Sequence, residues 1–400
     1  MSIFNTIRPV AHFIRSAICE SIGIRKSIIG IFPLIILPYA TVIAGSPDTN
    51  TTEIMTESSS TKNGTPVASK VTELQENYKF PVRGLAFSPN GKLLAIVSDH
   101  EFIRIFDWKK NVVVAKIEKA AGANDGLTKE RIRFSPDGQL LVACHSQASN
   151  DVVIRIWNTK TWEVLQDISD PLYGGCSAID FSLDGNVLLR ATRRVVDKPG
   201  ETLVAYSTNN WRRLWGISTL PFDPLTVALS PDGKFIALGG VLLNERNILE
   251  RQIRIFDSKS QALIQQIKNT VDLSFGQIAW CAGENRLAAV GTRAWDIASS
   301  KYIGGPDTTM IFDITTGEQI YGDSTGNLGI NTLRCTRDGK YLIKGNGTGR
   351  GNGTGVRIFD GKHAVLLQEI KGDIGSLAVT SDGRYLAIGS MGTTTIWKLN

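Results

Sequence analysis

The chain has 400 residues, of which 42% are hydrophobic and 20% are charged, a balance that supports a sizeable core and excludes an intrinsically disordered chain. With 39 glycines and only four histidines, the composition favours a turn-rich all-β protein over a histidine-ligated metal enzyme. The formal net charge is +6, but half of it lies in the first 44 residues and no run of Lys or Arg follows, so we expect no nucleic-acid partner.

Residues 1–44 have the layout of an export leader. Residues 28–44, IIGIFPLIILPYATVIA, are apolar, follow a basic pair and end in small or tolerated residues. We expect a signal peptide cleaved after Ala44, and hence a secreted or periplasmic protein. The alternatives are an uncleaved membrane anchor at residues 28–44 and an organellar presequence, because two prolines interrupt a run that is barely long enough to cross a bilayer.

Residues 45–70 are rich in Ser, Thr, Asn and Pro and nearly free of large apolar side chains. Such a segment cannot offset the entropy lost on folding, so we expect a disordered linker. The folded domain is then expected over residues 71–400.

One short turn recurs through the folded part, between two β-rich runs. Asp or Asn followed by Gly supplies the positive φ that a tight hairpin needs, so each copy predicts a pair of strands. The closing positions of the copies are 44 to 54 residues apart, a period typical of propeller blades. The seven copies are SPNG at 88–91, SPDG at 135–138, SLDG at 182–185, SPDG at 230–233, AGEN at 282–285, TRDG at 336–339 and TSDG at 380–383.

A third strand with an aromatic residue follows each turn, as in IRIFD at 103–107 and IRIWN at 154–158. Strand alternation is expected to point each large ring into the space between neighbouring sheets. A short polar turn and a fourth strand then complete each unit. The seven aromatic residues are Phe106, Trp157, Tyr206, Phe256, Phe312, Phe359 and Trp397.

Seven units of four strands resemble the seven-bladed WD-repeat β-propeller over residues 71–400. The resemblance implies an all-β ring of four-stranded antiparallel blades and a monomeric propeller. The Gly-His pair before the first strand is absent, and most third strands end in Phe-Asp where the family has Trp-Asp. These departures suggest a divergent, bacterial exported type.

The chain ends just after a third strand, so the last unit lacks its outer strand. Residues 71–76, VTELQE, precede the first turn as a fourth strand would. We predict that this N-terminal strand pairs with the last blade and closes the ring, which leaves no open blade interface.

The connection between the second and third strands varies most in length, with 14 to 27 residues from the turn to the aromatic position. Variable loops on a rigid scaffold are the usual place for binding specificity. The long connections of blades 3 to 6 are expected to form one rim, whose arginines and aromatics are residue types enriched at protein interfaces. Solvated loops, in which nearby acids neutralise the arginines, are the alternative. The candidate partner-binding residues are Arg193, Arg194, Arg246, Arg251, Arg293, Trp295, Tyr302 and Arg350.

The first strands carry a second candidate site, at one repeat position that should face the central channel. Small residues are expected there, but the position holds Arg133, Asp180 and Arg334 in three blades. Arg133 and Asp180 lie at the same register in neighbouring blades, which indicates a cross-blade ion pair. The alternative is that Arg334 meets a ligand carboxylate in the channel. Across all seven blades the position holds Ala86, Arg133, Asp180, Ala228, Trp280, Arg334 and Ala378.

The chain carries no pattern of catalytic chemistry. The cysteines show neither CxxC spacing nor a histidine partner, and four of them (Cys144, Cys176, Cys281, Cys335) lie in or beside apolar runs, so we expect small buried hydrophobic side chains. The histidines are isolated and no nucleophile-elbow or zinc-protease motif occurs, so we expect no metal, no cofactor and no enzyme.

The sequence therefore predicts an exported, non-catalytic propeller that binds a protein or peptide on the loop-rich face of blades 3 to 6. A ligand-binding or catalytic propeller of the quinoprotein or lactonase kind, with its site in the central channel, is the alternative.

Overall fold

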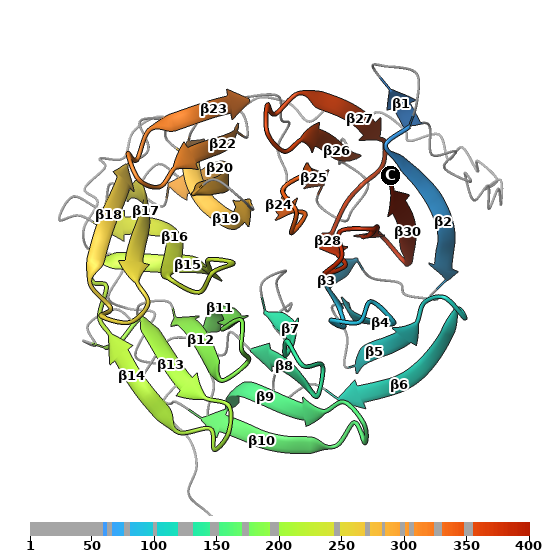
Figure 1. Cartoon of the computed structure of the whole chain (residues 1–400), viewed down its shortest axis with the longest axis horizontal. Coiled ribbons are helices and arrows are strands. Elements are labelled where there is room, and N and C mark those ends of the chain that lie inside the picture. The colour runs from blue at the N-terminus through green and yellow to red at the C-terminus, as the bar shows by residue number, and fades with distance from the viewer. Residues whose placement is uncertain are drawn as a thin grey trace, which may run out of the picture. The chain divides into compact units, whose positions relative to one another are not determined.

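Each of the seven predicted repeats contributes to an antiparallel sheet, and the seven sheets stand around a ring (Figure 1). All of these strands belong to one compact unit, residues 55–400. The computed structural model describes residues 59–61, 66–75, 81–98, 102–118, 131–144, 152–169, 176–192, 200–243, 249–268, 273–281, 285–296, 301–303, 308–323, 330–347 and 355–400.

The two inner strands of each blade are joined by the repeated turn. Strand a, nearest the centre, is β3 (Val82–Phe87), β7 (Ile132–Phe134), β11 (Cys176–Phe181), β15 (Phe222–Leu229), β19 (Leu273–Cys281), β24 (Ile330–Cys335) and β28 (Ser376–Val379) in blades 1 to 7. Strand b is β4 (Leu93–Ser98), β8 (Leu140–Cys144), β12 (Val187–Thr192), β16 (Phe235–Leu243), β20 (Arg286–Asp296), β25 (Tyr341–Gly347) and β29 (Tyr385–Gly389).

The two outer strands complete each sheet in the order a, b, c, d. Strand c is β5 (Phe102–Asp107), β9 (Val152–Asn158), β13 (Leu203–Ser207), β17 (Leu249–Asp257), β22 (Thr308–Asp313), β26 (Gly355–Asp360) and β30 (Thr393–Leu399). Strand d is β6 (Val112–Glu118), β10 (Val164–Ser169), β14 (Arg213–Ile217), β18 (Leu263–Lys268), β23 (Gln319–Asp323), β27 (Leu366–Ile370) and, in blade 7, β2 (Ala68–Gln75). Two short strands are added, β1 (Ser59–Thr61) on β27 and β21 (Lys301–Ile303) on β20.

The a–b and c–d turns lie on one face of the ring, as strand alternation predicts. In blade 2, Thr159 Oγ1 of the c–d turn donates a hydrogen bond to Gly138 O of the a–b turn at 2.6 Å. Ser258 and Gly233 repeat this bond in blade 4 at 2.6 Å. We call this side the turn face, and the side that carries the b–c and d–a connections the loop face.

The a–b turn recurs because its side chains satisfy its own backbone. In blade 4, Ser230 Oγ donates to Asp232 Oδ1 at 2.7 Å, which also accepts the Lys234 N–H at 3.1 Å. The Phe235 N–H in turn donates to Ser230 Oγ at 2.9 Å. Gly233 has a φ of 74°, a conformation that residues with a Cβ rarely adopt. The motif is therefore a local device that holds two strands in register.

These bonds make the turns sensitive to acid. The hydroxyl bond from Ser230, helped by the Lys234 amide and charge, lowers the pKa of Asp232 from 3.8 to about 2. Because the folded pKa is lower than the unfolded one, the stability that this group contributes is present above pH 3.8 and is lost as the pH falls towards about 2. Hydroxyl bonds from Ser182 and Thr336 likewise lower the pKa values of Asp184 and Asp338.

We predict that the midpoint of thermal unfolding falls steadily between pH 4 and pH 2, and that Asp232→Asn makes this fall shallower. Asn90 holds the same turn position in blade 1, where it accepts the Ser88 hydroxyl, so the substitution keeps the geometry without a titrating group. Scanning calorimetry across this range measures the effect. Glu163→Gln, at an exposed carboxylate outside the motif, is the control for the removal of one acidic group. Equal slopes for wild type and Asp232→Asn would contradict the assignment.

Seven hydrophobic clusters fill the spaces between adjacent blades, and the predicted strand c aromatics are all buried within them. Each ring packs on the preceding blade: Trp157 of blade 2, for example, lies with Ile103 and Ile105 of blade 1. Phe106 of blade 1 lies with Ala387 and Ile396 of blade 7, so the series of interfaces closes on itself. The blades are thus stabilised by their neighbours rather than by a common core.

The N-terminal strand closes the ring, as expected. β2 pairs antiparallel with β30 from Ala68 opposite Leu399 to Gln75 opposite Thr393, and Leu74 is fully buried. β2 begins three residues earlier than the predicted boundary at residue 71, and β1 also falls inside the range expected as a linker. The polar composition of this range does not indicate strands. They form because they pair with strands of blades 6 and 7, which are far away in the sequence.

Every outer strand carries a β-bulge at the same place, opposite the aromatic end of strand c. Bulges of this kind twist an edge and hinder pairing with another chain. The bulged residues are all apolar: Val71, Val114, Leu165, Leu214, Ile264, Ile320 and Leu367.

Two disulfides join adjacent blades, which corrects the expectation of four separate buried thiols. Cys144 of β8 is bonded to Cys176 of β11, linking blades 2 and 3 with a Cα–Cα distance of 5.8 Å. Cys281 of β19 is bonded to Cys335 of β24, linking blades 5 and 6 with a Cα–Cα distance of 5.2 Å. Both distances suit a disulfide.

Candidate functional site

The inner strands surround a cavity of about 420 Å³ at the centre of the ring. All seven residues of the repeat position singled out in the sequence line it, from Ala86 of blade 1 to Ala378 of blade 7. Turn residues such as Pro231, Arg337 and Ser381 line it as well, so the cavity lies towards the turn face. The residues at this one repeat position therefore line the channel in every blade.

Arg133 and Asp180 form the cross-blade ion pair that their register suggests. Arg133 Nε lies 3.9 Å from Asp180 Oδ1, and each side chain is about a quarter exposed, at 23% and 26%. Asp180 Oδ2 also accepts the Leu229 N–H of blade 4 at 2.9 Å. The carboxylate thus connects blades 2, 3 and 4, which gives it a structural role at the channel.

The opposite wall of the channel is cationic and aromatic. Arg334 donates from Nη1 to Leu333 O at 2.7 Å, and Arg337 is exposed on the turn of blade 6. Trp280 of blade 5 donates from its indole Nε1 to Ala228 O at 3.0 Å. This bond to a neighbouring blade fixes the indole at the channel wall.

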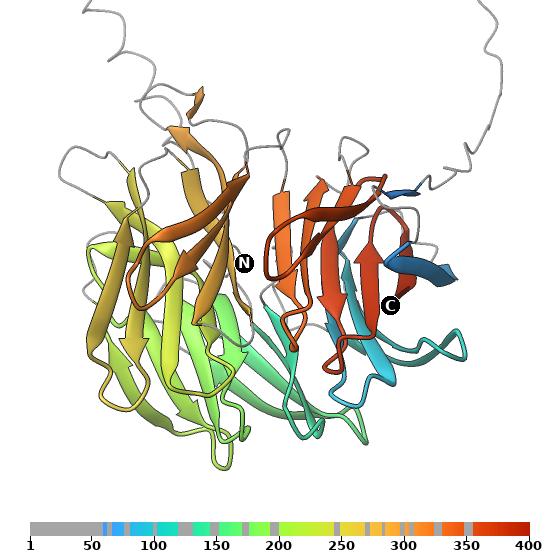
Figure 2. The ribbon, with the colours of Figure 1, turned by 45° about the horizontal axis from the view of Figure 1, so that its top comes forward.

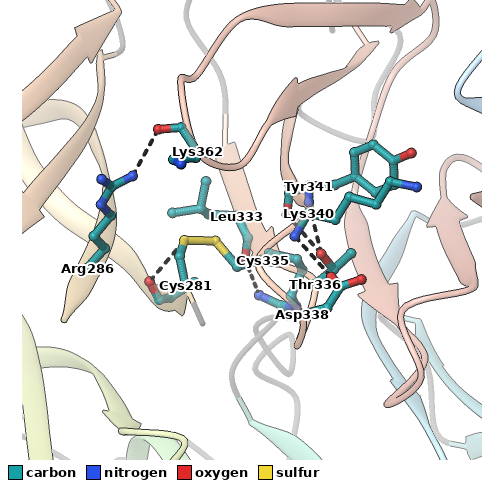
Figure 3. The surroundings of a disulfide bond; sticks show 11 residues. Cys281, Arg286, Leu333, Cys335, Thr336, Asp338, Lys340, Tyr341 and Lys362 are labelled. Atoms are coloured by element: carbon teal, nitrogen blue, oxygen red, sulfur yellow. Dashed lines mark hydrogen bonds between the residues drawn. A yellow bond between two sulfur atoms is a disulfide. The ribbon is translucent and has the colours of Figure 1, made fainter. Parts of the chain in front are cut away.

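A second cavity, of about 310 Å³, opens beside the channel between blades 4 and 5. Pro231 and Trp280 line both cavities, so the channel continues into this groove on the turn face. Phe235 stacks on Trp280 there, with ring centroids 6.3 Å apart and an interplanar angle of 22°. Arg286, also on the groove wall, donates to Lys362 O across the interface of blades 5 and 6, beside the Cys281–Cys335 disulfide (Figure 3).

The predicted rim of blades 3 to 6 is described only in part. Arg193, Arg194, Arg246 and Arg350 lie outside the described residues. β20 carries Arg293 and Trp295, and its pairing with β21 sets Trp295 opposite Tyr302. The long connection of blade 5 is thus a β-ribbon extending from the ring on the loop face, where an irregular loop was expected (Figure 2).

Arg251 does not lie on a surface rim, contrary to the prediction. It belongs to β17, which extends the hairpin of blade 4 by pairing Arg251 with Val241, and its exposed fraction is 3%. The sequence suggested a loop at this position, in which a charged side chain would face solvent. The hairpin of blade 4 is longer than predicted, and the side chain of Arg251 is therefore buried.

In the part of the chain that the structure describes, no three or more His, Cys, Asp or Glu side chains gather to hold a metal ion. No helix in this part of the chain has the length and apolar character needed to cross a membrane.

Seven four-stranded blades with buried strand c aromatics, six of them with an Asp/Asn-Gly turn, make this chain a WD-repeat-like seven-bladed β-propeller. The family described as "WD domain, G-beta repeat" matches residues 69–107, which run from β2 through β5. This segment joins the outer strand of blade 7 to three strands of blade 1, so one sequence repeat spans the closure of the ring. WD-repeat propellers are generally non-catalytic and typically serve as interaction scaffolds for proteins.

Two relatives are plant proteins from Arabidopsis thaliana. SEC12-like protein 2 is 26% identical over 189 residues, which cover 46% of this chain and 42% of the relative. WD repeat-containing protein VIP3 is 32% identical over 91 residues, which cover 22% of this chain and 26% of the relative. The chain thus spans less than half the length of these relatives, and neither supports the bacterial origin suggested by the motif departures.

Proposed function

We propose that this protein is an exported, non-catalytic scaffold that binds a protein partner through the loop face of blades 3 to 6. The observation that carries the proposal is the concentration of long b–c connections on one face of a rigid ring. The β20–β21 ribbon, in which Trp295 is paired opposite Tyr302, projects on that face. Aromatic residues on such a support are suited to anchor an interface.

The two disulfides support export. Disulfides persist in oxidising compartments and are rare in the cytosol, where thiols are kept reduced. Four of the five cysteines of the chain form these cross-links. N-terminal sequencing of the mature protein tests the leader directly: a start at Gly45 supports cleavage after Ala44, and an intact residue 1 supports the anchor.

Shortening the blade 5 ribbon is expected to abolish partner capture. The variant replaces residues 293–305 by a Gly-Ser connection, and proteins captured from the exported fraction are identified by mass spectrometry. The matched control shortens residues 121–128, which lie in the sequence between β6 of blade 1 and β7 of blade 2, and should keep all partners. Partners that persist unchanged on the ribbon variant would contradict the assignment of the rim.

A further inference from the structure

The turn-face end of the channel has an excess of positive charge. Arg133, Arg334 and Arg337 line the cavity together with one carboxylate, Asp180. That carboxylate is already engaged by Arg133 and by the Leu229 N–H. The described lining therefore carries three guanidinium groups and one carboxylate, and two of the guanidinium groups, those of Arg334 and Arg337, are only three positions apart in blade 6. A concave wall of low polarisability strengthens the attraction of such charges for an anion.

The groove between blades 4 and 5 adds an aromatic wall to this cationic end. Trp280 lines both cavities, and its ring is positioned by stacking with Phe235, which also lines the groove, and by the bond to Ala228. A rigid indole at the mouth of a groove is a good contact for an apolar or aromatic side chain, since little conformational freedom is lost on binding. The two cavities together suit a ligand longer than a single small anion.

We propose that the turn face carries a binding site for an acidic peptide segment of a partner protein. A Glu or Asp side chain of the segment is bound by Arg334 and Arg337 in the channel, and a neighbouring apolar side chain lies against Trp280 in the groove. Guanidinium groups match carboxylates because their N–H groups can donate two parallel bonds. Nucleic acid fits poorly, because its phosphates require a stripe of cations rather than one cavity. This site lies on the face opposite the rim, so it is independent of the function proposed above.

Binding of labelled peptides to the full chain tests the site. Fluorescein-labelled hexaglutamate is titrated by fluorescence anisotropy, with labelled hexaglutamine as the uncharged probe. We expect hexaglutamate to bind about tenfold more tightly than hexaglutamine, and its affinity to fall as salt is raised. Equal affinities of the two peptides, or no binding of either, would overturn the proposal.

Substitutions separate this site from general surface charge. Arg334→Gln with Arg337→Gln is expected to weaken hexaglutamate binding about tenfold, and Arg337→Gln alone, at an exposed position, to weaken it measurably without affecting folding. The matched control is Arg384→Gln, another exposed arginine on the turn face that lies outside the cavity, with an expected change of less than about twofold. An equal loss in the control would show that the probe reads only surface charge.

The groove and the kind of ligand have their own tests. A peptide in which phenylalanine replaces one central glutamate should bind more tightly than hexaglutamate to the wild type, but not to Trp280→Ala. If glutarate displaces the peptide with an affinity equal to that of hexaglutamate, the site takes a small dicarboxylate and the peptide proposal fails. The arginine variants should leave partner capture by the blade 5 ribbon unchanged, so the two proposals can fail separately.

Discussion

Reduction of the protein with dithiothreitol is expected to lower its midpoint of thermal unfolding by about 5–10 °C. The two disulfides close loops with sequence separations of 32 and 54 residues and link blades 2 with 3 and 5 with 6. Cross-links over such separations restrict the unfolded chain and typically stabilise a protein by about 2–4 kcal/mol each. In a ring held by neighbour contacts, they also prevent two of the seven interfaces from opening.

Paired substitutions identify each bridge in this experiment. Cys144→Ala with Cys176→Ala, and Cys281→Ala with Cys335→Ala, should each show part of the destabilisation and lose part of the response to the reductant. Alanine is used because Cys144 and Cys176 are fully buried, where a serine hydroxyl would need a new partner. If an alkylating reagent labels all four cysteines in unfolded, unreduced protein, the disulfides are absent and the prediction fails.

The fold was predictable because its determinants are local and repeated. The Ser-x-Asp-Gly turn satisfies its own backbone, and the strand c aromatic residue is buried by alternation alone, so each repeat specifies its blade without reference to distant sequence. The residues that line the channel were predictable for the same reason, because one repeat position faces the centre in every blade.

The disulfides could have been found in the same way. Cys281 and Cys335 both stand immediately before the turn, where the other blades hold Phe, Leu or Val, and equal repeat positions in adjacent blades are neighbours. The spacing that indicated the Arg133–Asp180 pair therefore indicated this bridge too. Cys144 and Cys176 occupy different strands of their repeats, and their pairing required the relative placement of two blades. The burial of Arg251 depends on how far a hairpin continues, which side-chain polarity does not determine.

A chain that begins at residue 77 is expected to lose cooperative unfolding and to aggregate, whereas a chain that begins at residue 66 should unfold like the full protein. The longer deletion removes β2, whose backbone pairs with β30 along its whole length and whose Leu74 is fully buried in the cluster between blades 7 and 1. Loss of that leucine side chain alone costs about 2–5 kcal/mol. Loss of β2 also leaves β30 as an open edge, because β30 then has no bulged strand d beside it, as strand c has in every other blade.

The deletion effect has two components, lost burial and an exposed edge, and a synthetic peptide of residues 66–76 distinguishes them from a general defect. Added in trans to the chain that begins at residue 77, the peptide can restore both components, since strand addition to an open edge is a known binding mode. We expect it to suppress light scattering and restore a single calorimetric transition, whereas the same peptide with Leu74→Asp should do neither. If the shorter chain unfolds cooperatively without the peptide, the ring does not depend on its N-terminal strand, and neighbour contacts among the six complete blades suffice.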